Sequence, residues 1–263
     1  MFAPIPTLDH VVVNVRDRMD EAVETYRGLG FTMTPRGYHT LGSMNHLAMF
    51  GTDYLELIAA DPNAATPRAD VMQFPCGLNG LVFGSEDSAA TYAACAAAGV
   101  PVQKPIGFSR PVELPDGARD ARFETVHLDP GTIPAGRVYF CQHFTRDLVW
   151  RDEWRHHANG VIGIAAMVMV ADDVDAPASV FARMFGRDAL APITGGQRLA
   201  VGLTAVEIIS PGECAARYGD AAPDAAGRAQ YMAGLVLRSR SINRIIPASA
   251  AMGAVMDLRT GVG

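Results

Sequence analysis

Two residues of this 263-residue chain, His10 and Glu56, have types and positions that suit metal chemistry. His10 stands near the start of the run LDHVVVNV, and Glu56 lies in the middle of the run YLELIA. Both runs are typical of buried strands. A charged glutamate in a core is costly unless a cation or hydrogen bonds compensate it. A divalent ion held by the imidazole and the carboxylate would do so, and Glu56 would also be available as a base.

A second interpretation of the same two residues needs no metal. Glu56 would then point to the outer face of its strand and be solvated, or it would pair with an arginine or with His10. Binding of Zn, Fe, Mn, Co or Ni would also need at least one further ligand. Residue types alone favour the metal-free interpretation.

The elements that must position these residues form one unit with the pattern βαβββ. A strand over residues 8–15 is followed by a helix over residues 19–26, in which apolar residues recur at helical spacing. Three short β-like runs then begin at Phe31, His46 and Tyr54.

The same pattern begins again after a polar, proline-containing connector. A strand from Leu78 precedes an alanine-rich helix over residues 86–99, and residues 101–113 are predicted to be a loop broken by prolines. Two further strands begin at Ala121 and Arg137. On this overlay Gly80 falls where His10 stands, and Cys141 or Gln142 falls near the position of Glu56.

A third unit begins at Val161, and its segment GLTAVEIISPG repeats the pattern of FGTDYLELIAADP around Glu56. Glu207 takes the place of Glu56, whereas Ala165 takes the place of His10, so Glu207 is predicted to be a structural or vestigial carboxylate. A fourth unit begins at Ala233, and the residues that remain are too few for a full set of strands.

Residues 145–160 differ in composition from the repeats and hold both tryptophans. Glycine and serine are scarce there and large aromatic side chains need a surface to bury against, so this segment is predicted to pack on the protein. A boundary between about Phe144 and Gly160 divides the chain into two predicted domains, residues 1–150 and residues 151–263, the second incomplete in its last module.

These features together resemble the vicinal oxygen chelate superfamily, and in detail its glyoxalase-like branch. The segments that carry the resemblance are LDHVVV, NHLAMFGTDYLELIA and FCQHFTRDLVWRDEWRHHANG, in this order. The resemblance implies an α+β fold of the glyoxalase and dihydroxybiphenyl dioxygenase type, in which tandem βαβββ modules pair into cupped sheets. It also implies one divalent metal ion, with ligands from the first and fourth strands, where His10 and Glu56 stand.

The resemblance further implies an enzyme that acts on a small oxygenated substrate, either as a lyase or isomerase or as a ring-cleaving dioxygenase. The ion would act as a Lewis acid, and Glu56 would serve as a ligand or, once displaced, as the catalytic base. The alternative is a metal-free protein of the same fold that sequesters a hydrophobic small molecule. Gly80 and Ala165 cannot ligate a metal and leave room for this alternative.

A third metal ligand is expected from the second unit. Side-chain alternation puts Cys141 and His143 on one face of their strand and Gln142 on the other. His143 offers the better ligand chemistry and completes the predicted metal set of His10, Glu56 and His143. The surrounding sequence FCQH equally suits a structural motif that docks the tryptophan-containing segment.

Four further polar residues are predicted to line the substrate pocket or to contribute a ligand, namely Asn45, His46, His127 and Gln142. For His46, an edge position in water is an equally good interpretation. No nucleophile elbow, phosphate-binding loop or HExxH motif is present in the sequence. Cys141 is favoured as a buried, inert thiol.

Composition limits the partners of the protein. The formal charge is −6 with both signs interspersed, which argues against binding to nucleic acid or to an anionic membrane. The four cysteines are widely separated, as is typical of free thiols in a reducing compartment, and no export or membrane signal is evident, so the cytoplasm is expected. The predicted partner is a small-molecule substrate, and a second copy of the chain is a further candidate.

Overall fold

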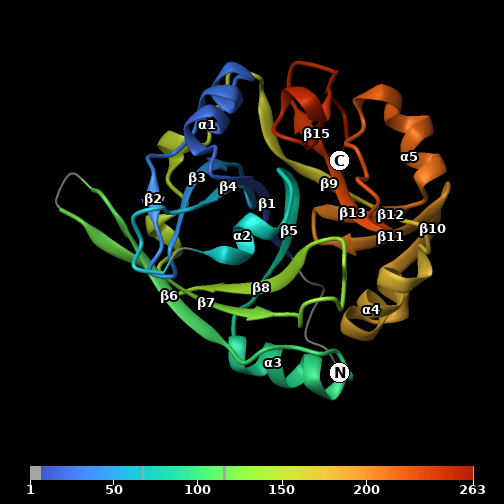
Figure 1. Cartoon of the computed structure of the whole chain (residues 1–263), viewed down its shortest axis with the longest axis horizontal. Coiled ribbons are helices and arrows are strands. Elements are labelled where there is room, and N and C mark those ends of the chain that lie inside the picture. Colours follow the sequence, from blue (N-terminus) through green and yellow to red (C-terminus); the bar gives the residue numbers. More distant parts are fainter. Residues whose placement is uncertain (1–6, 67, 115–116, 263) are drawn as a thin grey trace.

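The computed structural model describes residues 7–66, 68–114 and 117–262 of the chain. Its strands form two mixed sheets, of eight and seven strands, that lie side by side with the helices packed against them (Figure 1). The first sheet ends at His143 and the second begins at Val161. This arrangement is the predicted α+β fold of paired βαβββ modules.

The first unit has the predicted strand, helix and strand order. Its elements are β1 (Leu8–Arg16), α1 (Met19–Gly28), β2 (Gly37–Tyr38), β3 (Ser43–Met49) and β4 (Tyr54–Ala60), followed by the short helix α2 (Ala69–Gln73). The apolar residues at helical spacing in α1 are buried, as expected for a helix that packs against a sheet.

The prediction of a strand at Phe31 is wrong, because the second strand is the two-residue β2 further along the chain. Thr34 uses its polar groups in local contacts with β3: its hydroxyl accepts from the amide of Leu47, and its carbonyl lies 2.7 Å from Nδ1 of His46. Pro35 has no amide hydrogen to donate to a ladder. The segment is therefore a fixed coil beside the sheet.

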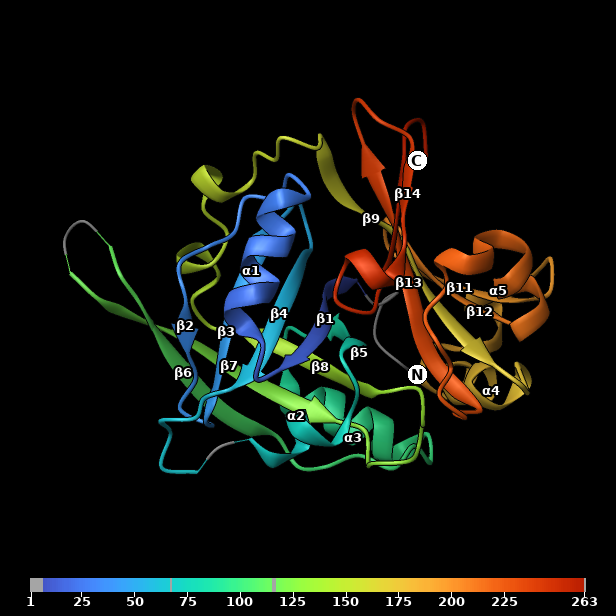
Figure 2. The same ribbon diagram turned by 45° about the horizontal axis from the view of Figure 1, so that its top comes forward.

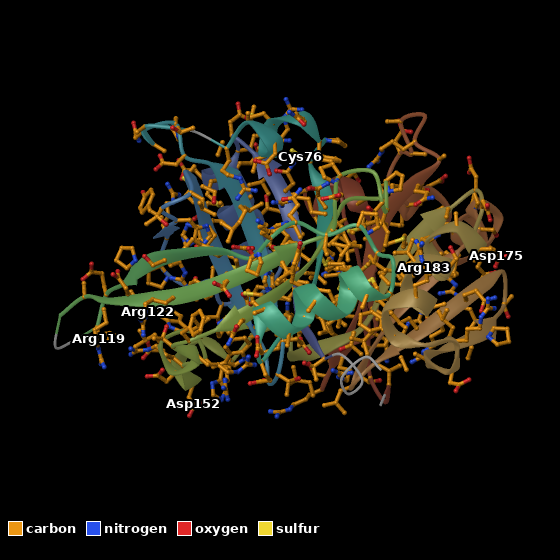
Figure 3. The ribbon with its side chains drawn as sticks, turned by 90° about the horizontal axis from the view of Figure 1, so that it is seen from below. Cys76, Arg119, Arg122, Asp152, Asp175 and Arg183 are labelled. Carbon is orange, nitrogen blue, oxygen red and sulfur yellow. The ribbon has the colours of Figure 1, made fainter. Side chains whose placement is uncertain are left out.

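The second unit contains a strand that the sequence analysis did not predict. Its elements are β5 (Gly77–Gly84), α3 (Ser88–Ala97), β6 (Ile106–Val112), β7 (Arg119–His127) and β8 (Arg137–His143). β6 lies within the segment that was predicted to be a loop. It is an edge strand and contains Pro111, which an edge position tolerates. The side chain of Asp87 caps α3, which lies across β7 and β8 (Figure 3).

The second half of the chain repeats the plan and then shortens it. Its elements are β9 (Val161–Ala171), α4 (Asp175–Phe185), β10 (Leu190–Ile193), β11 (Gly196–Val201), β12 (Thr204–Ile209), α5 (Pro211–Tyr218), β13 (Gln230–Ser239), β14 (Arg244–Ile246) and β15 (Val255–Arg259), with five single 3₁₀ turns in the described chain. Only four residues separate β13 from β14, so the last unit lacks the helix of the others.

Both sheets are organised around a central antiparallel pair of strands. The strand order is β2-β3-β4-β1-β5-β8-β7-β6 in the first sheet and β10-β11-β12-β9-β13-β15-β14 in the second. In each sheet the central strands also pair in parallel with the last strand of their own unit. This pseudo-twofold arrangement brings the first and last strands of each unit to the middle of the sheet.

The two sheets share one hydrophobic core, to which α1 and α4 contribute. Figure 2 shows α1 beside β4 of the first sheet and α4 beside the second sheet. Phe181 and Phe185 of α4 contact Phe83 of β5, and the hydroxyl of Tyr26 in α1 donates to the carbonyl of Ala251. The predicted division into domains at about residue 150 stays a prediction. None of the helices in the described parts of the chain is long and apolar enough to cross a membrane.

Candidate metal and substrate site

The first sheet curls into a cup whose two edge strands meet. The amide of Thr40 donates to the carbonyl of Ser109 at 3.1 Å, and the amide of Ser109 donates to the hydroxyl of Thr40 at 3.3 Å. The hollow of the cup holds a cavity of about 60 Å³. Its polar lining consists mainly of His10, His39, Asn45, Glu56, Arg68, Arg110, His127 and Arg137, and its aromatic lining consists of Tyr54, Phe108, Phe123 and Tyr139.

His10 and Glu56 face each other in this cup, as the strand register requires. In the parallel pair β1 and β4, His10 lies opposite Tyr54 and Glu56 lies opposite Val12, so both side chains project from the same face. Nε2 of His10 is 3.6 Å from Oε2 of Glu56, and both residues are at most 5% exposed. The amide of Asn45 donates to Oε1 of Glu56 at 2.7 Å.

Asp9 fixes the imidazole of His10 from behind. A register shift in β1 between Leu8 and His10 marks a bulge at Asp9, which turns this carboxylate toward its neighbour. Oδ2 of Asp9 is 2.7 Å from Nδ1 of His10 and 3.0 Å from Nε2 of His143, and Oδ1 is 3.5 Å from Arg146. With Nδ1 donating to the carboxylate, Nε2 of His10 presents its lone pair to the cup.

Charge explains how a buried aspartate can remain ionised. Burial alone would raise the pKa of Asp9, but the charge of His143 and the hydrogen bonds from His10 and His143 outweigh it, and the pKa lies well below its usual range. For Glu56, burial likewise raises the pKa, and the charges of His10 and His39 together with the bond from Asn45 bring it below the ordinary value. The site therefore contains two buried carboxylates.

The pairing of the central strands identifies the two remaining positions of the site. In the antiparallel pair β1 and β5, Val11 lies opposite Leu81 and Val12 lies opposite Gly80. A pseudo-twofold axis through the pair of Val11 and Leu81 makes Gly80 the equivalent of His10, as predicted. A Cβ atom at Gly80 would lie 2.6 Å from the side chain of Val12. No side chain fits at this position, so β5 contributes no ligand there.

By the same pseudo-twofold symmetry, Tyr139 on β8 is the equivalent of Glu56 on β4. The predicted overlay of Cys141 or Gln142 on Glu56 is wrong by two or three residues along this strand. The hydroxyl of Tyr139 lies 3.3 Å from Nε2 of His10, so it completes a group of three donor atoms. Metal ligands at about 2.1 Å keep neighbouring donor atoms roughly 3.0–3.4 Å apart. Nε2 of His10 lies 3.6 Å from Oε2 of Glu56 and 3.3 Å from the hydroxyl of Tyr139, and both distances are close to this spacing.

His143, the predicted third ligand, is on the far side of Asp9 from this group. Its Nε2 bonds to Asp9, its Nδ1 is buried without a partner among the described residues, and its ring packs against Trp150 at 5.1 Å. The alternative interpretation, that His143 docks the tryptophan-containing segment, describes this contact. Trp150 itself packs edge-on against Tyr54.

The four predicted pocket residues separate into two groups. Asn45 and His127 line the cup, and the ring of His127 stacks on Tyr139 at 4.3 Å. Gln142 points away from the cup and bonds to the amide of Ser88 and to the carbonyl of Glu86, at the start of α3. His46 is buried outside the cup, between the carbonyl of Thr34 and the guanidinium of Arg36.

A second group of metal-capable side chains adjoins the first. One ligand atom from each of Asp9, Cys141 and His143 lies within 4.8 Å of the others. Burial and the charges of Asp9 and Glu56 raise the pKa of the Cys141 thiol well above its ordinary value. A thiolate is the form that binds metals, so this environment disfavours Cys141 as a ligand.

The sequence analysis missed Asp9, which holds His10 from behind the cup, and it also missed five residues that line the cup, namely His39, Arg68, Arg110, Arg137 and Tyr139. Asp9 was missed because adjacent residues of a regular strand point to opposite faces, and only the bulge overturns that rule. His39 follows the two-residue strand β2, and Arg110 lies on the strand β6 that was predicted to be a loop. The adjacent pair Asp9 and His10 was the one signal available in the sequence.

The corresponding face of the second sheet is filled. By strand register Glu207 matches Glu56, and Ala166, rather than the predicted Ala165, matches His10. Helix α5 covers this face, and its Arg217 bonds to Glu207 and to Glu213. The prediction that Glu207 has no histidine partner therefore holds at the corrected position.

Comparison with known proteins points to one family. A family model described as Glyoxalase-like domain matches residues 8–185. Among solved structures, a hypothetical protein from Staphylococcus aureus superposes with a TM-score of 0.73 at 15% identity, covering 97% of this chain and 100% of that one. No curated protein sequence matches the chain.

Two further structures carry names that describe an activity. A triple mutant of 4-hydroxymandelate synthase from Streptomyces coelicolor has a TM-score of 0.52 at 14% identity, covering 92% of this chain and 72% of that one. A fusion of a xylose isomerase-like TIM barrel with 4-hydroxyphenylpyruvate dioxygenase has a TM-score of 0.57 at 13% identity, covering 95% of this chain and 39% of that one. At these identities the likeness concerns the fold alone.

Proposed function

This chain belongs to the Glyoxalase-like domain family, and from this premise we propose that its first cup holds one divalent metal ion and acts on a small oxygenated substrate. Zn, Fe, Mn, Co and Ni suit an imidazole and a carboxylate as ligands. His10 and Glu56 would hold the ion, and the protonated hydroxyl of Tyr139 lies beside His10.

The observation that carries the proposal is the buried pair of His10 and Glu56 with Asp9 behind it. A carboxylate that orients the other nitrogen of an imidazole is the arrangement found behind histidine ligands of metals. Here Asp9 orients Nδ1, so Nε2 is free to ligate beside Oε2 of Glu56. The charge of a bound ion would compensate the buried glutamate.

The chemistry that the ion supplies when bound is the polarisation of a carbonyl or hydroxyl oxygen of the substrate. Glu56 lines the cavity with its Oε1 held by Asn45, and once its carboxylate is displaced from the ion it could take up and return a proton. Tyr139 keeps its hydroxyl proton because burial raises its pKa, and it can donate a hydrogen bond to a substrate oxygen. The aromatic lining excludes water from this exchange.

Among reaction types, the ligand set favours isomerase or lyase chemistry over ring-cleaving dioxygenation. Oxygenases with non-haem iron commonly use two histidines and one carboxylate. This cup offers His10 and Glu56, and Gly80 stands where a second histidine would be. Proton transfer assisted by a Lewis acid needs fewer protein ligands and leaves open positions for the substrate.

The proposal is tested by assaying purified protein on a panel of small α-hydroxy and α-oxo carbonyl compounds, with and without a chelator. We expect turnover that the chelator removes and that one of the five metals restores. His10→Ala should abolish it, and Glu207→Ala should leave it unchanged. Turnover that persists in His10→Ala would contradict the proposal.

A second candidate function is a metal-free protein that sequesters a small molecule in the same cup. It is favoured by the absence of a side chain at Gly80 and by the bond of His143 to Asp9, which occupies the nitrogen that was expected to ligate. It predicts ligand binding without turnover and without any bound metal.

A further inference from the structure

Arg110 is a buried cation of the cup that has no ion-pair partner among the described residues, although the charge of Glu56 acts on it from a longer distance. It belongs to β6, is 8% exposed and lines the cavity that contains His10 and Glu56. No hydrogen bond or ion pair joins its guanidinium to any residue in the described parts of the chain. Buried charges in proteins are normally paired, so this arginine points to a ligand of opposite charge.

Gly37 shapes the path of the Arg110 side chain through the cup. A Cβ atom at Gly37 would lie 2.5 Å from Oδ1 of Asn45 and 3.0 Å from Cδ of Arg110, so any larger residue would displace one of them. The guanidinium consequently lies near Asn45, which in turn bonds to Glu56. An anion on Arg110 would be next to the proposed metal pair.

Two further arginines line the same cavity, but they already have partners. Arg68 bonds to Asp70 through two of its nitrogens, and Arg137 bonds to Asn79 at 3.0 Å and lies 3.7 Å from Asp70. One aspartate therefore faces two arginines, and Nη2 of Arg137 is buried without a partner among the described residues. The wall of the cup carries an excess of positive charge.

Two histidines of the cup have lowered pKa values in this environment. Burial, with a contribution from Arg110 and Arg68, lowers the pKa of His39 to about 4. Burial, with a contribution from Arg137 and Arg68, lowers the pKa of His127 to about 4. Both rings are neutral at pH 7 and leave the excess positive charge to the arginines.

The size of the cavity limits the ligand. A water molecule needs about 10–15 Å³ of such volume, so the inner cavity of about 60 Å³ holds a group of a few heavy atoms. A larger cavity of about 480 Å³ adjoins it and shares Leu41, Arg68, Thr125, His127 and Arg137. A small head group can therefore enter while a longer substituent occupies the outer space.

We infer that the substrate of the first cup carries a carboxylate, and that Arg110 binds this group beside the His10 and Glu56 pair. This inference rests on the proposed function for the role of the cup. The planar fork of a guanidinium matches a carboxylate with two parallel hydrogen bonds, and water exclusion strengthens such a pair. A neutral compound of the same shape would leave the buried charge uncompensated.

The test compares propionate with its neutral analogue propionamide, by ligand-observed NMR titration of the full chain. Because a carboxylate can itself coordinate a divalent ion, the titration is run on chelator-treated protein, in which binding of propionate reports on the arginine. We expect the wild type to bind propionate more than tenfold more tightly than propionamide. Arg110→Gln should remove this preference, and Arg110→Lys should retain part of it. Arg122→Gln, a substitution of an exposed arginine of β7 (Figure 3), is the matched control and should keep it.

Each outcome separates this inference from the proposed function. Equal binding of the two probes by the wild type would overturn the inference even if the protein retains metal. Tighter binding of inorganic phosphate than of propionate would also overturn it, in favour of a phosphate ligand. A preference for propionate that depends on Arg110, in protein that retains no metal, would uphold the carboxylate site and reject the proposed metal chemistry.

Discussion

In the first cup Glu56 faces His10 across 3.6 Å and borders a cavity, whereas in the second half Glu207 is bound by Arg217 of helix α5. The two glutamates occupy matching positions of matching sheets, each opposite the same point of the central strand. In the second half a cation of the chain compensates the carboxylate. In the first half the compensation comes from a titratable imidazole and from Asn45.

The difference extends to β15, the last strand of the shortened unit. Asp257 of β15 occupies the position that Tyr139 occupies in β8, and Arg259 binds it. The second half therefore holds two carboxylates, each with its own arginine, beneath a helix that fills the hollow. An arginine of the chain and a bound metal ion can each compensate a buried carboxylate, and among the described residues only the first cup leaves space for the ion.

Removal of Asp9 should give the largest effect on stability, because it breaks the network that holds His10. Asp9→Ala leaves His10, His143 and Arg146 without their shared acceptor, and loss of one partner of a buried pair costs about 3–5 kcal/mol. Urea unfolding of the variant at neutral pH measures this loss. Asp17→Ala, a substitution of an exposed aspartate at the end of the same strand, is the control.

The stabilisation from Asp9 should also depend on pH with a definite sign. Because its folded-state pKa lies below the ordinary value of 3.8, the contribution is fully present above about pH 4 and is lost as the pH falls below it. The wild type should therefore lose more stability than Asp9→Ala on acidification below pH 4. Parallel unfolding curves at all pH values would show that Asp9 does not act through its charge.

Removal of the arginine in the second half should cost less. Arg217→Met keeps most of the apolar stem but leaves Glu207 and Glu213 without their shared donor, for a loss of about 2 kcal/mol, since the glutamates are partly exposed. Thermal unfolding measures it. Arg183→Met on α4 is the control, because Arg183 is exposed (Figure 3) and makes only a long contact with the carbonyl of Gly99. An unchanged melting temperature would mean that Arg217 does not compensate the glutamates, and the proposed difference between the two halves would be lost.

The smallest predicted effect concerns His143. Because it touches Asp9 and not the donor group of His10, Glu56 and Tyr139, His143→Ala should weaken metal binding by about tenfold rather than abolish it. A competition titration with a metal indicator measures the change. Complete loss of binding would show that His143 is a direct ligand and that the ion binds between His143 and Asp9.

Period-2 and helical patterns in the sequence were sufficient to predict the repeating units, because each strand and helix buries a continuous face. They also predicted that His10 and Glu56 lie on buried strands of one unit, whereas the expectation that the two residues meet at one site came from the family resemblance. The residue at the bulge, Asp9, could not be predicted, because a bulge depends on pairing with β5 rather than on local sequence.

The short and edge strands account for the remaining errors. β2 has two residues, and β6 begins with exposed residues and contains a proline, so neither has the pattern of a buried strand. His39 and Arg110 are near or on these strands, and the cup acquires them only when its edges meet. The counterpart of Glu56 was predicted at Cys141 or Gln142 and is Tyr139, because loop lengths between the units differ.

The most direct test of the account is the number of divalent ions that the full chain retains after loading and dialysis, measured by elemental analysis of untagged protein. The account predicts one ion per chain in the wild type, in Glu207→Ala and in Cys141→Ser, and none in His10→Ala or Glu56→Ala. Melting temperature provides a parallel readout, because only variants that keep the site should be stabilised by added metal. Loss of the ion in Cys141→Ser or Glu207→Ala together with its retention in Glu56→Ala would contradict the account.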